Sequence, residues 1–271
     1  MRRLVNQHPG RTGGVLLALL PFVLLLAAYL LGSNARLAVN PDDKLLPSLS
    51  SIASTLQHYV IEEDLRSGGR LFWADTWASL VRLATALAIS ATLAMAFGVV
   101  VGTLPLLRSL MSPFFAALSM IPPLAILPIL FIVLGLGEAA KITLIAVGIT
   151  PCMIRDLSLK TQELPGEQLI KAQTLGASSW QLITRVIVPQ IWPRLVDTLR
   201  LNLGPAWLFL IAAEAIASTE GLGYRIFLVR RYLSMDVILP YVLWITLLAF
   251  AMDQLLRFAR GRLFPWAQAG H

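Results

Sequence analysis

Long runs without a charged residue dominate the chain and predict membrane-spanning helices. Such runs cover residues 12–35, 83–107 and 109–137, and each exceeds the ~20 residues that a helix needs to cross the hydrocarbon core. With the shorter apolar stretches, six helices are predicted, at about 14–32, 78–104, 110–135, 138–158, 197–217 and 237–257. A membrane β-barrel would instead show ~10-residue segments of alternating polarity. The predicted fold class is therefore an all-α integral membrane protein with six transmembrane helices.

The third predicted helix is irregular. It contains Pro113, Pro122, Pro123 and Pro128, which lack a backbone N–H and predict a break or a kink. Backbone carbonyls freed in this way, with Met120 beside them, either line a transport path or belong to a packing kink that no solute touches. Both interpretations stay open.

Charged residues near the ends of the predicted helices are expected to reach the membrane interfaces. Only thirteen residues separate Lys141 from Arg155, so the fourth helix spans the membrane if both long side chains snorkel outward. Arg82 and Asp253 are expected to be interfacial in the same way.

Composition agrees with a polytopic membrane protein. Of 271 residues, 57% are hydrophobic and 14% charged, whereas an ordinary soluble domain has about 25% charged residues. Cys152 is the only cysteine, so no disulfide forms within the chain and a packing role is expected. The first apolar segment is too long for a signal peptide and lacks a small-residue cleavage site, which predicts a retained anchor.

The distribution of Lys and Arg predicts the orientation. With the N-terminus in the cytoplasm, the inner segments hold thirteen of the 22 basic residues, and the outer segments hold eight together with nine acids. Both termini are then expected in the cytoplasm. The net charge of +7 is explained by this topology rather than by nucleic-acid binding. The predicted division is 1–13 cytoplasmic, 14–32 first helix, 33–77 outer loop, 78–258 five-helix core and 259–271 cytoplasmic tail.

The outer loop contains apolar residues at helical spacing. They predict a short amphipathic helix along the outer surface. These residues are Leu49, Ile52, Ala53, Leu56 and Val60.

A polar segment at about 160–195 predicts two short helices joined by a turn. Pro165 and Glu167 suit the first turn of a helix, and Glu167 and Lys171 form an i,i+4 pair. Gly176 is suited to the left-handed conformation that ends the helix. Ser178 and Gln181 then have the spacing of a capping box.

The second short helix has an apolar stripe at Trp180, Ile183 and Ile187, and Pro189 is expected to end or kink it. From these features alone, the segment is either a linker between membrane helices or a docking element for a soluble partner.

The spacing of Ala172, Gly176, Val186, Val188 and Pro189 resembles the loop that marks permease subunits of ATP-binding-cassette (ABC) importers. In that family the loop reads Glu-Ala-Ala, three residues, Gly, nine residues, Ile-x-Leu-Pro. The chain is similar to the nitrate, sulfonate, taurine and bicarbonate branch over about residues 45–258. Further matching segments are Leu46–Ser48, Ser79 with Arg82, Ile121–Ala125, Arg200 with Leu203–Trp207, Ala213–Glu214, Gly221–Tyr224 and Asp253.

The resemblance implies a type I importer permease, in which the first loop helix is a coupling helix that lies in a groove of a cytoplasmic ATPase. It also implies two permease copies, a homodimer in this branch, two ATPase subunits and a periplasmic or lipid-anchored solute-binding protein. The chain has no G-x-x-x-x-G-K-[ST] phosphate loop, so ATP and Mg²⁺ are expected on the partner ATPase and no cofactor on this chain. The expected coupling residues are Glu167, Ile170, Lys171, Ala172, Gln173, Gly176, Ala177, Ser178 and Pro189.

The loop departs from the family pattern in its first two positions. Ile170 stands where the motif has Glu, and Lys171 stands where it has the first Ala. One hypothesis is that Glu167 supplies the carboxylate one turn earlier while Lys171 meets an acidic or neutral part of the groove. The alternative is a drifted position without a coupling consequence.

Glu214 is an acidic residue within the fifth predicted helix. A carboxylate in a membrane helix is expected to face the bundle interior or water, which predicts either a role in the pathway or a structural anchor. The candidate pathway or gate residues are Met120, Pro122, Pro123, Asn202, Glu214, Gly221, Gly223 and Tyr224. Gly221–Tyr224 with Arg225, Arg230 and Arg231 could form a re-entrant gate that meets the binding protein or favours an anion, or could be exposed arginines without a ligand.

The predicted function is a non-enzymatic permease subunit for a small polar solute. Candidates are sulfonates, nitrate, bicarbonate and small nitrogen compounds such as guanidine or urea. The alternatives are a proton-coupled carrier that uses Glu214 and a membrane enzyme. No catalytic or metal-binding motif supports an enzyme, and the three histidines lie outside the predicted helices.

Overall fold

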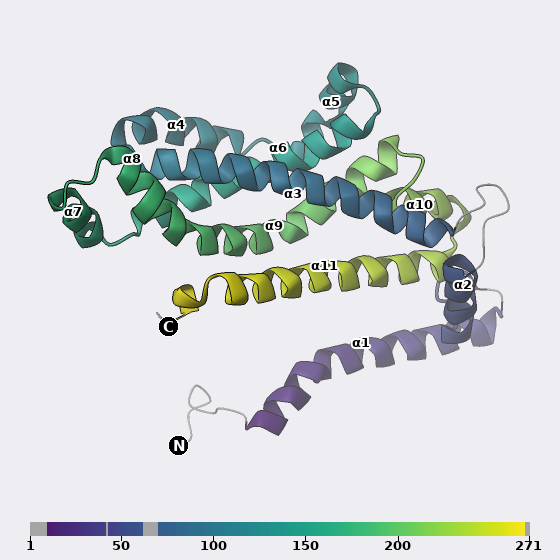
Figure 1. Ribbon diagram of the computed structural model, residues 1–271. Helices are drawn as coiled ribbons and strands as arrows, with labels where there is room; N and C mark the ends of the chain where they lie inside the picture. Colours follow the sequence, from purple (N-terminus) through teal and green to yellow (C-terminus); the bar gives the residue numbers. More distant parts are fainter. Residues whose placement is uncertain (1–9, 42, 62–69, 269–271) are drawn as a thin grey trace. The chain divides into compact units, whose positions relative to one another are not determined.

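The computed structural model describes residues 10–41, 43–61 and 70–268, and the regular elements within these ranges are helices (Figure 1). The predicted cytoplasmic ends therefore lie partly outside the described residues. The chain divides into two compact units. The first comprises residues 1–62 and 229–240, and the second comprises residues 63–228 and 241–271.

The first unit contains α1 (Arg11–Val39) and α2 (Leu49–Ile61). The loop between them returns to the end of α1, where the Tyr29 hydroxyl donates to the Pro47 carbonyl at 2.7 Å. Arg36 donates to the Asp43 carboxylate, and this hydrogen bond holds the pKa of Asp43 below its ordinary value. The predicted helix in the loop is confirmed as α2, where the Thr55 hydroxyl donates to Asp236 at 3.0 Å.

The second unit is built around three long helices, α3 (Leu71–Thr103), α6 (Glu138–Gln162) and α9 (Val188–Ala217), which pack on one another. Helices α3 and α6 run in the same direction, because Arg82 contacts Glu138 near one end and Gly102 contacts Thr161 near the other. The last part of α11 (Met235–Leu263) belongs to this unit from Tyr241 onward.

Two glycines allow the close approach of α3 to α6. A Cβ atom added at Gly98 would lie 2.7 Å from Leu157 Cβ, and one added at Gly102 would lie 2.5 Å from Thr161 Cβ. No side chain larger than hydrogen fits at either position. The two helices therefore form one closely packed body.

The third predicted span is broken, as the prolines predict. α4 (Pro105–Leu118) ends at Ser119, a 3₁₀ turn follows at Pro123–Ile126, and α5 (Leu127–Leu134) continues at 79° to α4. The chain therefore has five helices that are long and apolar enough to cross a membrane, or six if this bent pair is one span, within the described residues.

Pro189 does not end its helix, which was one of the two outcomes that the sequence predicted. α8 (Ser179–Gln181) passes through a π-helical stretch, Leu182–Ile187, directly into α9, which continues to Ala217. A proline ring clashes with the carbonyl four residues earlier, and the wider π turn before Pro189 accommodates it without breaking the helix. The fifth span is therefore longer than the predicted 197–217.

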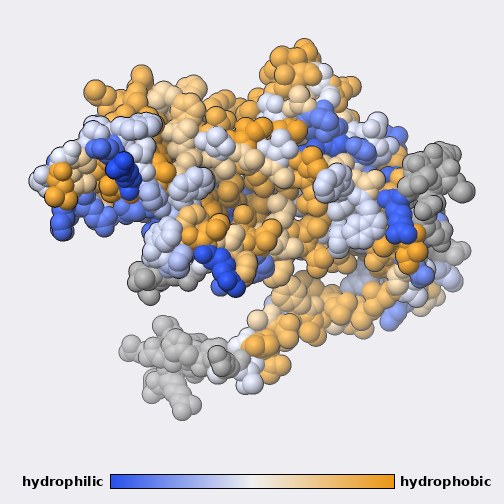
Figure 2. Space-filling view, viewed as in Figure 1, coloured by the Kyte–Doolittle hydropathy of each residue, from blue (hydrophilic) through white to orange (hydrophobic). Residues whose placement is uncertain are grey.

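The remaining short elements are α7 (Gly166–Thr174), α10 (Leu222–Val229) and 3₁₀ turns at Arg230–Tyr232 and Pro265–Gln268. In the second unit, α7 and α10 mark opposite ends, which are named the α7 end and the α10 end below (Figure 1). Figure 2 shows apolar surface along the long helices, while hydrophilic residues gather where α7 lies.

We expect Gly102→Ala to reduce stability by about 1–3 kcal/mol, because the new methyl group overpacks the contact with Thr161 and the Ser158 carbonyl. Gly204→Ala is the matched control, since no atom lies within 4 Å of its added Cβ. The control should be neutral or stabilise by up to about 1 kcal/mol through helix propensity. Thermal unfolding of both variants in nanodiscs checks this, and equal melting temperatures would contradict the packing argument.

Candidate functional site

The predicted helix–turn–helix is present as α7, a turn and α8. The Ala177 N–H donates to the Ala172 carbonyl at 3.1 Å, and Gly176 adopts φ 85°, as predicted for a left-handed helix end. The capping box is also confirmed. The Ser178 N–H donates to Gln181 Oε1 at 2.9 Å, and the Gln181 N–H donates to Ser178 Oγ at 3.3 Å.

This loop presents large apolar side chains to solvent. Ile170, Leu175 and Trp180 are 62, 82 and 73% exposed. Glu167 and Lys171 are exposed too, and within the described chain no ion pair joins them. Isolated exposed apolar residues are common, but three on one short capped segment form a local apolar surface of the kind found at interaction sites.

The other predicted loop residues lie on the same body. Gln173, Gly176, Ser178 and Pro189 are exposed, whereas Ala172 and Ala177 are half-buried. From Ser179 the chain runs through α8 and the π-helical stretch without interruption into α9, so α8 and α9 form one continuous helical element.

Glu214 lies at the α10 end, fully buried, in a cluster of charged residues. Its carboxylate accepts a hydrogen bond from Arg82 Nη1 at 2.8 Å and one from Ser79 Oγ at 2.7 Å. Arg82 also donates to Glu138, and Lys141 Nζ donates to Glu138 at 2.8 Å. The cluster thereby connects α3, α6 and α9.

The turn before α10 is part of this cluster. Three consecutive backbone N–H groups, at residues 221–223, donate to Asp75, Ser79 and Glu214 in that order, at 2.8, 2.9 and 2.8 Å. Gly221 has φ 122°, and a Cβ there would lie 2.5 Å from Glu214 Cδ. Only glycine is compatible with this turn, because the backbone wraps closely around the carboxylate.

These contacts favour the structural-anchor interpretation of Glu214. Its oxygens are occupied by a guanidinium, a hydroxyl and a backbone N–H, so no acceptor site faces a passing solute. Gly221 and Gly223, both buried, belong to the same anchor. Tyr224 is half-buried beside Arg225, whose guanidinium lies 5.8 Å from the Tyr224 ring centroid.

The prediction that the side chains of Arg82 and Lys141 snorkel to the interfaces was wrong, whereas the interfacial position of Asp253 stays a prediction. Arg82 and Lys141 are buried in the cluster at the α10 end. Asp253 accepts from Arg200 at 2.8 and 3.0 Å, which ties α11 to α9. Arg82 and Asp253 have charged partners on other helices, and Lys141 pairs with Glu138 on its own helix. Such pairing offsets the desolvation cost of a lone charge.

The charge cluster could have been found in the sequence. Asp75, Ser79 and Arg82 have i, i+4, i+7 spacing, which places them on one helix face. They were missed because the second helix was predicted to start at residue 78, whereas it starts at Leu71. Arg225, predicted as part of an exposed basic group, instead pairs with Asp75 at 2.8 Å.

The other predicted pathway residues lie away from this cluster. Met120 and Pro122 are exposed and Pro123 is half-buried at the break between α4 and α5, and this break contacts α6 at Arg155. Arg155 is seventeen residues after Glu138 on α6, about 26 Å along a helix. Asn202 is half-buried and donates to the carbonyl one turn earlier on α9. Apart from Asn202, the predicted pathway residues therefore fall into two groups, one around the buried Glu214 carboxylate and one at the exposed break between α4 and α5.

Residues 94–265 match the family described as the binding-protein-dependent transport system inner membrane component. The chain belongs to this family. The permease is 34% identical over 194 residues to the taurine transport system permease protein of Escherichia coli (strain K12), covering 72% of this chain and 70% of that protein. It is 26% identical to the putative aliphatic sulfonates transport permease protein of Bacillus subtilis (strain 168), covering 97% of this chain and 92% of that protein.

A solved structure of the MetNI methionine ABC transporter in an inward-facing conformation shares the fold. The TM-score is 0.57 at 22% identity, over 69% of this chain and 95% of that chain. These comparisons confirm the resemblance to type I ABC importer permeases of the taurine, sulfonate, nitrate and bicarbonate branch. The permease is a multi-pass membrane component of a transporter rather than an enzyme.

We expect Glu214→Ala to cost about 3–5 kcal/mol of stability, because it leaves buried donors on Arg82, Ser79 and Gly223 without their acceptor. The control Glu220→Ala should cost less than ~1 kcal/mol, since that carboxylate is 57% exposed and 3.4 Å from Arg82. Melting temperatures in nanodiscs measure both. A double Arg82→Met, Glu214→Met variant should lose less than the sum of the two single variants. Additive losses would exclude a coupled pair.

Proposed function

We propose that this permease is the membrane subunit of an ATP-driven importer in a bacterial inner membrane, with a separate binding protein that delivers a small polar solute from outside. The observation that carries the proposal is the capped α7–α8 segment with its exposed Ile170, Leu175 and Trp180. The chain has no phosphate loop of its own, so ATP and Mg²⁺ belong on a partner ATPase.

The α7–α8 segment is the proposed coupling element, with α7 lying in a groove of the ATPase. Three features support this role: a rigid turn, an apolar exposed surface, and continuity with α9. Movement of the groove during ATP binding would move α7, and α9 would carry that movement into the membrane.

The proposed orientation has both termini and the α7 end in the cytoplasm. It rests on the excess of Lys and Arg in the segments on that side. The α10 end, with its buried charge cluster, then lies toward the outer face, where the binding protein would dock.

Two copies of this chain are proposed to form the path, because a single bundle leaves much apolar and irregular backbone at the α4–α5 break exposed. The solute is proposed to be of the class named for the relatives, which are permeases for taurine, sulfonates, nitrate and bicarbonate. Small nitrogen compounds such as guanidine or urea are further candidates for the solute.

The departure at Ile170 and Lys171 suggests how this permease selects its ATPase. Ile170 is exposed on α7, so an apolar contact replaces the carboxylate of the family motif, and Glu167 lies one turn earlier with its side chain exposed. We infer that the partner groove is apolar opposite Ile170 and acidic or neutral opposite Lys171.

Uptake into vesicles tests the proposed function directly. Vesicles that contain this permease, its ATPase subunits and solute-loaded binding protein should accumulate the solute only when ATP is supplied to the ATPase side. A protonophore should not reduce uptake. Uptake driven by a proton gradient without the ATPase would instead establish a secondary carrier and overturn the proposal.

Glu167→Ala and Lys171→Glu test the coupling surface. Each should lower ATP-dependent uptake about tenfold, equivalent to the loss of about 1.4 kcal/mol at the interface. Arg262→Glu serves as a charge-reversal control, since it lies near the end of α11 and outside the loop. Wild-type uptake in both loop variants would show that these positions have no coupling role.

A further inference from the structure

Arg155 is a charged residue of a membrane-spanning helix without a carboxylate partner in the described chain. Its Nη1 donates to Ser119 Oγ at 2.6 Å, and no ion pair within 4.0 Å includes it. The other charges of α6 are engaged: Lys141 with Glu138, Asp156 with Thr198, and Lys160 with Glu163. A guanidinium has five N–H donors, so Arg155 retains most of its hydrogen-bonding capacity.

The length of α6 brings the backbone of Lys141, of Arg155 or of both to hydrocarbon depth. Thirteen residues separate Lys141 from Arg155, about 20 Å of helix, whereas the hydrocarbon core is about 30 Å thick. At least one of the two charges therefore lies within the core. Lys141 is buried and paired, whereas Arg155 is exposed on the surface of the single chain. An intramembrane charge of this kind faces a water-filled path or another protein surface.

The break between α4 and α5 lies directly beside Arg155. Ser119 is the first residue after α4, and the carbonyl oxygens of Ser119, Met120 and Ile121 accept no backbone hydrogen bond in the described part of the chain. Pro122 and Pro123 lack the N–H groups that would otherwise serve such acceptors. Met120 is 76% exposed and Ile121 is 45% exposed, so the break lies on an open surface.

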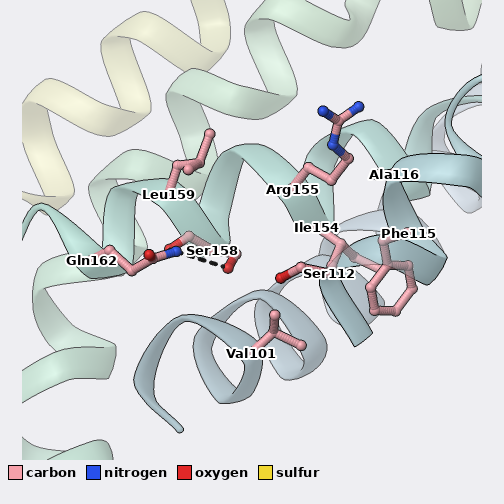
Figure 3. Close-up of a pocket in the computed structure, with 9 residues that line it drawn as sticks. All are labelled: Val101, Ser112, Phe115, Ala116, Ile154, Arg155, Ser158, Leu159 and Gln162. Atoms are coloured by element: carbon pink, nitrogen blue, oxygen red, sulfur yellow. Dashed lines mark hydrogen bonds between the residues drawn. The ribbon is translucent and has the colours of Figure 1, made fainter. Parts of the chain in front are cut away.

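Arg155 stands at the edge of a hollow of about 210 Å³ between α3, α4 and α6. Figure 3 shows its guanidinium directed away from Val101 and Ser112 on the opposite wall. Within the hollow, Gln162 Nε2 donates to the Ser158 carbonyl at 3.0 Å, so those polar groups satisfy one another. The Arg155 donors and the carbonyls of the break are thus polar groups that the described chain leaves open to a partner.

We propose that Arg155 and the open backbone at Ser119–Ile121 form a contact site for the transported solute, with Arg155 binding an anionic group and the carbonyl oxygens accepting hydrogen bonds from an amine or ammonium. A guanidinium holds a sulfonate or carboxylate through two parallel N–H donors. Carbonyl oxygens repel a bare anion but stabilise an N–H donor. The site therefore fits a small zwitterion, such as an aminosulfonate, better than nitrate or bicarbonate. This assignment rests on the proposed function, because it requires that the chain line a solute path.

Saturation-transfer NMR on the full permease with its ATPase subunits in nanodiscs tests the site without the binding protein. The probes are taurine, which carries both a sulfonate and an ammonium group, ethanesulfonate, which carries only the anion, and ethylamine, which carries only the ammonium. Taurine should give a signal at least about fivefold stronger than either single-group probe. Equal signals for taurine and ethanesulfonate, or no taurine signal, would overturn the assignment.

Variants at Arg155 test whether the taurine NMR signal arises from this site. Arg155→Gln should reduce the taurine signal about tenfold, and Arg155→Lys should retain part of it because the charge remains. Arg257→Gln on α11 is the control and should leave the signal unchanged. An unchanged signal in Arg155→Gln overturns the proposal. The proposal is also overturned if Arg155→Gln changes the subunit stoichiometry, measured by native mass spectrometry, without changing the NMR signal. Arg155 would then be a contact between copies of the chain.

Uptake assays separate this proposal from the proposed function. With wild-type uptake driven by ATP, Arg155→Gln should lose uptake about tenfold while ATP hydrolysis stimulated by loaded binding protein stays within about twofold. Full uptake in Arg155→Gln overturns the contact site and leaves the importer function intact. Wild-type uptake that needs no ATP overturns the importer function itself.

Discussion

The hydrogen-bonded ion pair between Glu214 and Arg82, with 2.8 Å between Oε1 and Nη1, organises the α10 end of the second unit. A carboxylate inside a membrane bundle is stable only when donors surround it, and this requirement places Ser79 on one side and the backbone of Gly223 on another. The turn before α10 can wrap the carboxylate because Gly221 has no side chain to collide with it. One buried charge thus determines how three helices and a turn meet.

The α7 end is held by different forces. Close packing at Gly98 and Gly102 replaces ion pairing between α3 and α6, and the π-helical stretch before Pro189 keeps α8 and α9 in one continuous helix. The proposed coupling role depends on this continuity, because a helix without a break can move as one body.

The charged residues of the membrane-spanning helices differ in their partners. Arg82 and Lys141 are neutralised by carboxylates, so they offer no binding site to an anion. Arg155 differs because it meets only a serine hydroxyl beside broken backbone. The contrast separates Arg82 and Lys141, which stabilise the bundle, from Arg155, to which we assign the solute contact.

The sequence by itself determined the class of the protein. Uncharged runs identified the spans, proline density identified the broken one, and Gly176 with Ser178 identified the capped loop, because each depends on local chemistry. At Pro189, local chemistry predicted an end or a kink of the helix, whereas the neighbouring turns widen to accept the ring and the helix continues. Only the tertiary structure decided which charges pair. Burial of Arg82 against Glu214 brings together residues 132 positions apart in the sequence, and no periodicity along one helix encodes that contact.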